Sequence, residues 1–209
     1  MRVELMQGRS NDRRWGIALL LAVPLLGLVI AQDVTSHVDW LISDQWVLRG
    51  DAAFGWWAEL LKAVSLIGDF VPRLIISFAV ALWLYRGERV VAAISFLLLP
   101  FLAGAYSSLF KLLFDRPRPQ LIAHLDHVSS ASYPSGHMTG AVLLYAMLVM
   151  VTPKRWRRLV LVCALMMMAL TGLSRISLGV HWATDIVGGA CVGLGFALLA
   201  RPYLVAAEA

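Results

Sequence analysis

ASYPSGHMTGAVLLYAMLVM, residues 131–150, joins a polar turn directly to an apolar run. The run is apolar enough to enter a membrane, whereas the turn before it carries a proline, a serine, a glycine and a histidine. Proline and glycine mark a break between two segments, and histidine exchanges protons near neutral pH. The stretch therefore predicts a membrane helix that begins beside a titratable group.

The composition of the whole chain agrees with a membrane location. The 209 residues are 60% hydrophobic and 15% charged, with a mean hydropathy of +0.75. Soluble globular proteins are roughly 45–50% apolar and about 25% charged, so we expect an integral membrane protein surrounded by a lipid bilayer. The net charge of +5 comes from short basic clusters between apolar runs, a pattern that argues against nucleic-acid binding.

Apolar segments suggest an all-α bundle of six transmembrane helices, which we predict as a single domain over residues 1–209. The segments cover about 15–32, 71–85, 90–113, 138–152, 158–174 and 183–204. The second and fourth are shorter than the roughly 20 residues that span a bilayer, and they reach that length by including semi-polar neighbours. Four tryptophans among charges between the first two segments predict helices lying in the membrane interface.

Small residues and cysteines in the spans point to packing roles. Gly189 and Gly193 form a GxxxG pattern, which favours close helix packing. Cys163 and Cys191 lie in apolar runs without a CxxC or zinc-ligand spacing, so no redox role is predicted for them.

The distribution of Lys and Arg predicts the orientation in the membrane. Eleven of the 18 basic residues fall at the N-terminal flank, in the second and fourth connections, and at Arg201. By the positive-inside rule this side is cytoplasmic, which places both termini in the cytoplasm. Among the seven basic residues on the outer side, Lys111, Arg116, Arg118 and Arg175 need an explanation, because ionisable groups at membrane depth indicate function.

Two connections that emerge on the outer face, residues 114–137 and 175–182, hold most of the unusual polar side chains. Lys111, Arg118 and Arg175 are able to surround a group with several negative charges, since arginine forks bind non-bridging phosphate oxygens. Ser135 and Gly136 form a turn at a helix start, where free N–H groups and the positive end of the helix favour anions. The pattern predicts a phosphate site.

Two histidines supply the chemistry for such a site. His181 and Asp185 lie four residues apart, so the carboxylate can hold one ring nitrogen and leave the other free to attack. His137 arrives from the other connection and is suited to protonate a leaving oxygen. Asp115 and Arg116 either contact the substrate or pair with each other.

These residues form three blocks that are similar to the signature of the type 2 phosphatidic acid phosphatase (PAP2) superfamily. KLLFDRPRP gives K-x6-R-P at residues 111–119, PSGH covers 134–137, and SRISLGVHWATD gives S-R-x5-H-x3-D at 174–185. The superfamily also contains vanadium haloperoxidases and glucose-6-phosphatase. The six-helix pattern extends the resemblance to most of the chain.

The resemblance implies a phosphatase that needs neither a metal nor another cofactor. The histidine that matches His181 becomes transiently phosphorylated, the carboxylate that matches Asp185 supports it, and the one that matches His137 acts as acid. The phosphate would be held by Lys111, Arg118, Ser135, Gly136 and Arg175. The sequence near these blocks has no DxD or His-rich ligand cluster, which suits a site where three cations replace a metal.

The expected substrate is a phosphorylated membrane lipid. The three blocks fit four lipids equally well, namely undecaprenyl diphosphate, phosphatidylglycerophosphate, phosphatidic acid and a lipid A phosphate. The expected location is a bacterial plasma membrane, with the active site on the extracytoplasmic side. Two alternatives use the same residues: a lipid phosphotransferase that passes the phosphate to another lipid, and a phospholipid-binding membrane protein without catalysis.

Overall fold

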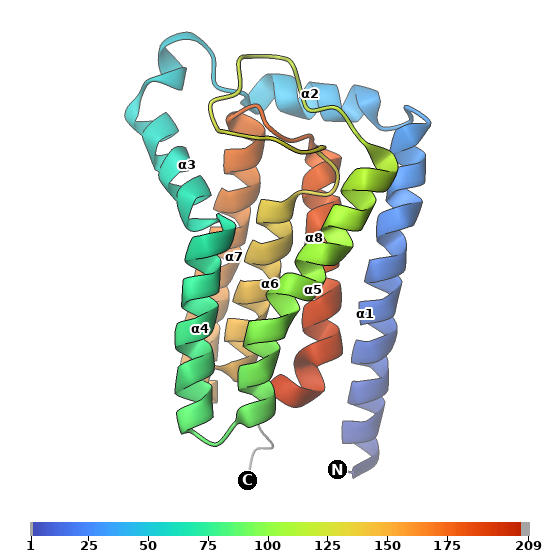
Figure 1. The fold of residues 1–209 in the computed structure, drawn as a ribbon, viewed down its shortest axis with the longest axis vertical. Helices are drawn as coiled ribbons and strands as arrows, with labels where there is room; N and C mark the ends of the chain where they lie inside the picture. Colours follow the sequence, from blue (N-terminus) through green and yellow to red (C-terminus); the bar gives the residue numbers. More distant parts are fainter. Residues whose placement is uncertain (1, 206–209) are drawn as a thin grey trace.

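The computed structural model describes residues 2–205 and shows a bundle of α-helices without a strand in that range (Figure 1). The single-domain prediction for 1–209 extends to residue 1 and residues 206–209, which lie outside the described residues. The helices are α1 (Arg2–Ala31), α2 (Ser36–Trp46), α3 (Trp56–Ile67), α4 (Phe70–Arg86), α5 (Val90–Phe114), α6 (Gly136–Val151), α7 (Lys154–Ser177) and α8 (Ala183–Leu204), with a 3-10 turn η1 (Gly50–Ala53) before α3.

The predicted all-α membrane bundle is confirmed. Among the described residues, α5, α7, α8 and the Ser10–Ala31 part of α1 are long and apolar enough to cross a bilayer by themselves. The segment Gly50–Ile67 and α4 pass the same test together as a pair bent by 54°. The short α6 corresponds to the remaining predicted span, so the count of six agrees broadly with the structure.

α2 and α3, which lie between the first two predicted spans, take different positions in the bundle. α2 lies across one end of the bundle (Figure 1). α3 instead buries Ala58, Leu61 and Val64, packs against α7, and leads through the bend into α4. The predicted interfacial position therefore fits α2, whereas α3 extends a helix that is too short to span the membrane by itself.

The quoted stretch forms α6, which sits inside the bundle. With 16 residues α6 is about 24 Å long at 1.5 Å per residue, less than the roughly 30 Å of a bilayer core. α6 packs against α4, α5, α7 and α8, so its ends need not match the lipid thickness. In Figure 1 it begins below the upper ends of α7 and α8, which leaves space for the polar turn.

Glycines on α8 allow the close approach of α6, as the GxxxG pattern predicted. A Cβ atom at Gly189 would lie 2.5 Å from the carbonyl oxygen of Ser135, and one at Gly193 would lie 2.5 Å from that of Thr139. Both obstacles are backbone atoms, which cannot rotate away. Two helices that approach this closely gain van der Waals contact, which drives helix association in lipid.

We predict that Gly193→Ala destabilises the protein, because the added methyl group forces α6 and α8 apart. The cost should be about 1–3 kcal/mol, as for other overpacked helix contacts. Gly104→Ala on α5 is the matched control, since a Cβ atom there meets nothing within 4 Å. Thermal unfolding in detergent measures both variants, and equal melting temperatures would contradict the prediction.

Candidate active site

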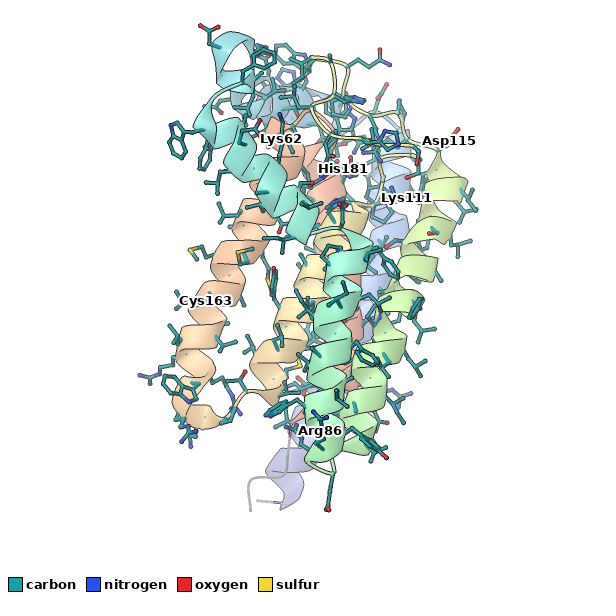
Figure 2. All side chains as sticks on the ribbon, turned by 60° about the vertical axis from the view of Figure 1, so that its left-hand side comes forward. Lys62, Arg86, Lys111, Asp115, Cys163 and His181 are labelled. Carbon is teal, nitrogen blue, oxygen red and sulfur yellow. The ribbon has the colours of Figure 1, made fainter. Side chains whose placement is uncertain are left out.

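The predicted site residues gather at one end of the bundle, where the C-terminal ends of α5 and α7 meet the N-terminal ends of α6 and α8. Figure 2 shows Lys111 and His181 at this end and Arg86 at the other. The backbone N–H of Ser135 donates to the Asp185 carbonyl at 3.0 Å, which joins the start of α6 to the start of α8. The connections 115–135 and 178–182 lie over the same region.

His181 and Asp185 form the buried pair that their spacing predicted. The Asp185 Oδ2 atom lies 3.2 Å from Nδ1 of His181, and it also accepts the backbone N–H of Trp182 at 2.9 Å. His181 is 2% exposed and Asp185 is fully buried. With Nδ1 held by the carboxylate, the lone pair on Nε2 is free to act as a nucleophile.

The environment of His181 keeps its ring neutral. Burial disfavours the charged imidazolium and lowers the pKa of His181 from 6.5 to about 4, although Asp185 opposes the shift. A ring with this pKa carries no proton on Nε2 near pH 7. His181 therefore has the protonation state that attack on a phosphorus atom requires.

Lys111 and Arg118 reach the same space from α5 and the loop that follows it. Nη1 of Arg118 lies 3.4 Å from Nε2 of His181 and donates to the Val180 carbonyl at 2.6 Å. Lys111 donates its Nζ–H to the Ala131 carbonyl. Both cations are thus held by neutral backbone oxygens, and Arg118 lies beside Nε2 of His181.

Arg175 is fixed by two partners that the sequence analysis did not identify. Its Nη1 donates to Asp126 Oδ2 at 2.5 Å and to the Ser65 hydroxyl, while its Nε is buried without a partner among the described residues. Burial alone would raise the pKa of Asp126, but hydrogen bonds from Ser65 and Arg175 outweigh it and lower that pKa. Asp126 is therefore a carboxylate near neutral pH, and the unpaired Nε of Arg175 remains for another acceptor.

His137 also has charged neighbours outside the three sequence blocks. Its Nε2 lies 2.9 Å from Asp69 Oδ1 at the bend between α3 and α4, although the two groups are not aligned as a hydrogen bond. Arg73 on α4 donates to the carbonyls of Gly136 and His137 at 3.1 and 2.8 Å. Gly140 gives it room, because a Cβ atom there would collide with the guanidinium. Arg73 is one of the seven basic residues predicted on the outer side, and no role was predicted for it. Its place in the first turn of an apolar helix was the available signal.

The turn before α6 has the form expected for an anion site. Ser135 is fully buried and caps the helix, since its Oγ accepts the N–H of Met138 at 3.4 Å. Gly136 begins the helix, so the first N–H groups lie beside His137. The roles of Ser135 and Gly136 as phosphate ligands stay predictions.

Asp115 and Arg116 do not pair with each other, which was one of the two sequence alternatives. Arg116 pairs with Asp185 and with Asp39 of α2, at 2.6 and 2.7 Å, and not with Asp115. The side chain of Asp115 is exposed, and its backbone takes the left-handed conformation that ends α5. Arg116 thus contacts the partner of His181, and substrate contact by Asp115 or Arg116 stays a prediction.

A cavity of about 310 Å³ extends from Lys111 and His137 into the apolar interior of the bundle, while His181 and Arg118 lie outside its lining. Asp69, Arg73, Lys111 and His137 line it together with apolar residues of α4, α5 and α6. Such a cavity suits a molecule with a charged head and an apolar body. Within the described residues, no group of three or more His, Cys, Asp or Glu side chains could hold a metal ion.

Comparisons with known proteins agree with this arrangement. Residues 90–208 match the model of the PAP2 superfamily. Phosphatidylglycerophosphatase B of Bacillus subtilis is 28% identical over 198 residues, which cover 90% of this chain and 93% of that protein. A crystal structure of a transmembrane PAP2 type phosphatidylglycerolphosphate phosphatase from Bacillus subtilis superposes with a TM-score of 0.76, 26% identity, and coverage of 90% and 94%. Lipid A 1-phosphatase of Rhizobium etli is 27% identical over 106 residues, 46% of this chain and 44% of that protein.

We predict that His181 titrates near pH 4. Histidine labelled with ¹³C gives one NMR signal for each of the five rings, and the His181 signal is the one missing in His181→Ala. Because burial penalises the charged ring, proton uptake should have its midpoint at about 4. A midpoint near 6.5, the ordinary value for histidine, would contradict the prediction. In Asp185→Asn the midpoint should move lower still, since the carboxylate favours the charged ring.

Proposed function

Because the chain belongs to the PAP2 superfamily, we propose that this membrane lipid phosphate phosphatase hydrolyses phosphatidylglycerophosphate through a phosphohistidine on His181. The position of His181 carries the proposal. Its Nδ1 is held by Asp185, and its Nε2 lies beside Arg118. A relative aligned over nine-tenths of the chain is a phosphatidylglycerophosphatase, which supports this lipid over the other three candidates.

The proposed reaction has two displacements at phosphorus. In the first, the Nε2 lone pair of His181 forms a bond to phosphorus, the ester P–O bond breaks, and His137 gives its proton to the departing lipid oxygen. In the second, His137 takes a proton from water, the water oxygen attacks phosphorus, and the P–N bond breaks to release inorganic phosphate. Lys111, Arg118 and Arg175 would stabilise the charge on the phosphoryl oxygens.

The cavity supports a lipid as the substrate. Its polar end carries His137 and Lys111, and its walls on α4, α5 and α6 include Leu74, Pro100 and Leu144. A phosphate at the polar end would leave the acyl part of the lipid along these apolar side chains. Burying that part provides binding energy without using the reacting groups.

We expect wild-type protein in detergent with EDTA to release inorganic phosphate from phosphatidylglycerophosphate faster than from phosphatidic acid, undecaprenyl diphosphate or lipid A. His181→Ala should lower kcat by about a thousandfold or more, because it removes the nucleophile. His137→Ala should lower it by about 10²–10⁴-fold, the usual contribution of a general acid.

His37→Ala is the matched control, since His37 is exposed on α2. Equal activity of wild type and His181→Ala would refute the phosphohistidine. Transfer of phosphate to an added acceptor lipid without inorganic phosphate would assign phosphotransfer instead of hydrolysis. A preference for another lipid would overturn the substrate assignment alone.

We also propose that the site faces the extracytoplasmic side of a bacterial plasma membrane, with both termini in the cytoplasm. The charge distribution supports this orientation. Arg86 ends α4, Arg89 precedes α5, and the basic cluster 154–158 begins α7. The α4–α5 and α6–α7 connections beside these residues lie at the end of the bundle opposite the site (Figures 1 and 2). Basic residues concentrate on the cytoplasmic side of membrane proteins.

Labelling of single cysteines tests the orientation. In a background with Cys163→Ala and Cys191→Ala, a membrane-impermeant maleimide should label Ser129→Cys in intact cells, because Ser129 is exposed in the loop over the site. Glu88→Cys, in the exposed α4–α5 turn, should react only after the membrane is opened. The reverse labelling pattern would place the site in the cytoplasm.

A further inference from the structure

The geometry points to Asp39, on the interfacial helix α2, as a positioning residue for Asp185. This inference rests on the proposed function, in which Asp185 orients the nucleophile His181. Asp39 lies 146 positions before Asp185 in the sequence and belongs to none of the three signature blocks. It reaches the site through Arg116 and Thr184, which sit between the two carboxylates.

Hydrogen bonds link Asp39, Arg116, Thr184 and Asp185 into one network. Nη2 of Arg116 donates to Asp39 Oδ2 at 2.7 Å, and its Nη1 donates to Asp185 Oδ1 at 2.6 Å. Thr184 donates its backbone N–H to Asp39 Oδ1 at 2.9 Å and its hydroxyl to Oδ2 at 2.7 Å. Asp39 therefore holds both the arginine and the residue next to Asp185.

This hydrogen-bond network determines which oxygen of Asp185 faces His181. Arg116 occupies Oδ1, so Oδ2 is left to His181 and the N–H of Trp182. Without Asp39 one side of the Arg116 fork has no anion, and the guanidinium is free to swing toward Asp185 and take both oxygens. Asp39 thus keeps Arg116 shared between two carboxylates. As a result, Oδ2 of Asp185 remains available to orient His181.

Burying the charged side chains of this network costs free energy. The side chains of Asp39, Arg116 and Asp185 are 1%, 10% and 0% exposed. A buried ion pair is seldom favoured for stability over an apolar contact, so its presence needs another reason. α2 is also inverted relative to a soluble helix, because it buries Asp39 and Ser43 while Val38, Leu41 and Trp46 are exposed. An apolar outer face suits the membrane interface and turns the carboxylate toward the site.

Kinetics of Asp39→Asn test the inference. We expect kcat for phosphate release to fall about tenfold to a hundredfold, the usual effect of losing a group that orients a functional ligand, with KM changed less than about twofold. Asp44→Asn is the matched control, because Asp44 is on the same helix and pairs with an arginine, Arg49, at an exposed position. It should match wild type in both parameters.

The titration of His181 separates positioning from folding. If Arg116 takes both oxygens of Asp185 in Asp39→Asn, His181 loses its carboxylate partner, and the ¹³C signal of its ring should titrate at lower pH than in wild type. An unchanged His181 titration together with a lower kcat would assign a merely structural role to Asp39 and overturn the inference, as would unchanged kcat in Asp39→Asn or failure of that variant to fold. Loss of the proposed function would instead appear as full activity in His181→Ala.

Discussion

The hydrogen bond from the Ser135 N–H to the Asp185 carbonyl joins the two parts of the site, and the glycines of α8 make it possible. It connects the turn that carries His137 with the helix start that carries Asp185. The bond requires α6 and α8 to approach more closely than a Cβ atom at Gly189 would allow. The direction of the chain places the starts of α6 and α8 at the same end of the bundle, and the glycines of α8 let these two starts come into contact. Helix packing therefore also fixes the distance between the turn that carries His137 and the helix start that carries Asp185.

A second constraint is that charges inside a membrane protein need partners. Asp126 meets Arg175, Asp39 and Asp185 share Arg116, and Asp69 lies beside His137. Each pair joins different helices or loops, so the pairs also fix the positions of these elements. The loop 115–135 carries two of the partners and is packed by Leu125 and Val128 against an apolar cluster that includes α3 residues. The loop is thus part of the site and not only a connection.

The sequence predicted the helices and the three blocks well because both signals are local. Apolar runs mark the spans, and the spacing of His181 and Asp185 places both on one face at a helix start. The partners of those residues were not predictable in the same way. Five single polar residues without a motif reach the site only through the packing of α2, α3, α4 and the loop 115–135: Asp39, Ser65, Asp69, Arg73 and Asp126. Arg116 illustrates the difference, since its block was found but its two carboxylates lie 77 and 69 positions away.

The pairing of charges also separates the cations that hold the protein together from those that can attract a substrate. Arg116 and Arg175 are bound to carboxylates, which offset much of their charge. Lys111 and Arg118 are held by backbone carbonyls, which orient them without neutralising them. Opposite charges attract strongly in a medium of low dielectric constant, so in the proposed reaction these two cations would supply most of the attraction for an incoming phosphate. Arg118, which has no carboxylate partner among the described residues, lies beside Nε2 of His181, where the proposed reaction would place the phosphoryl group.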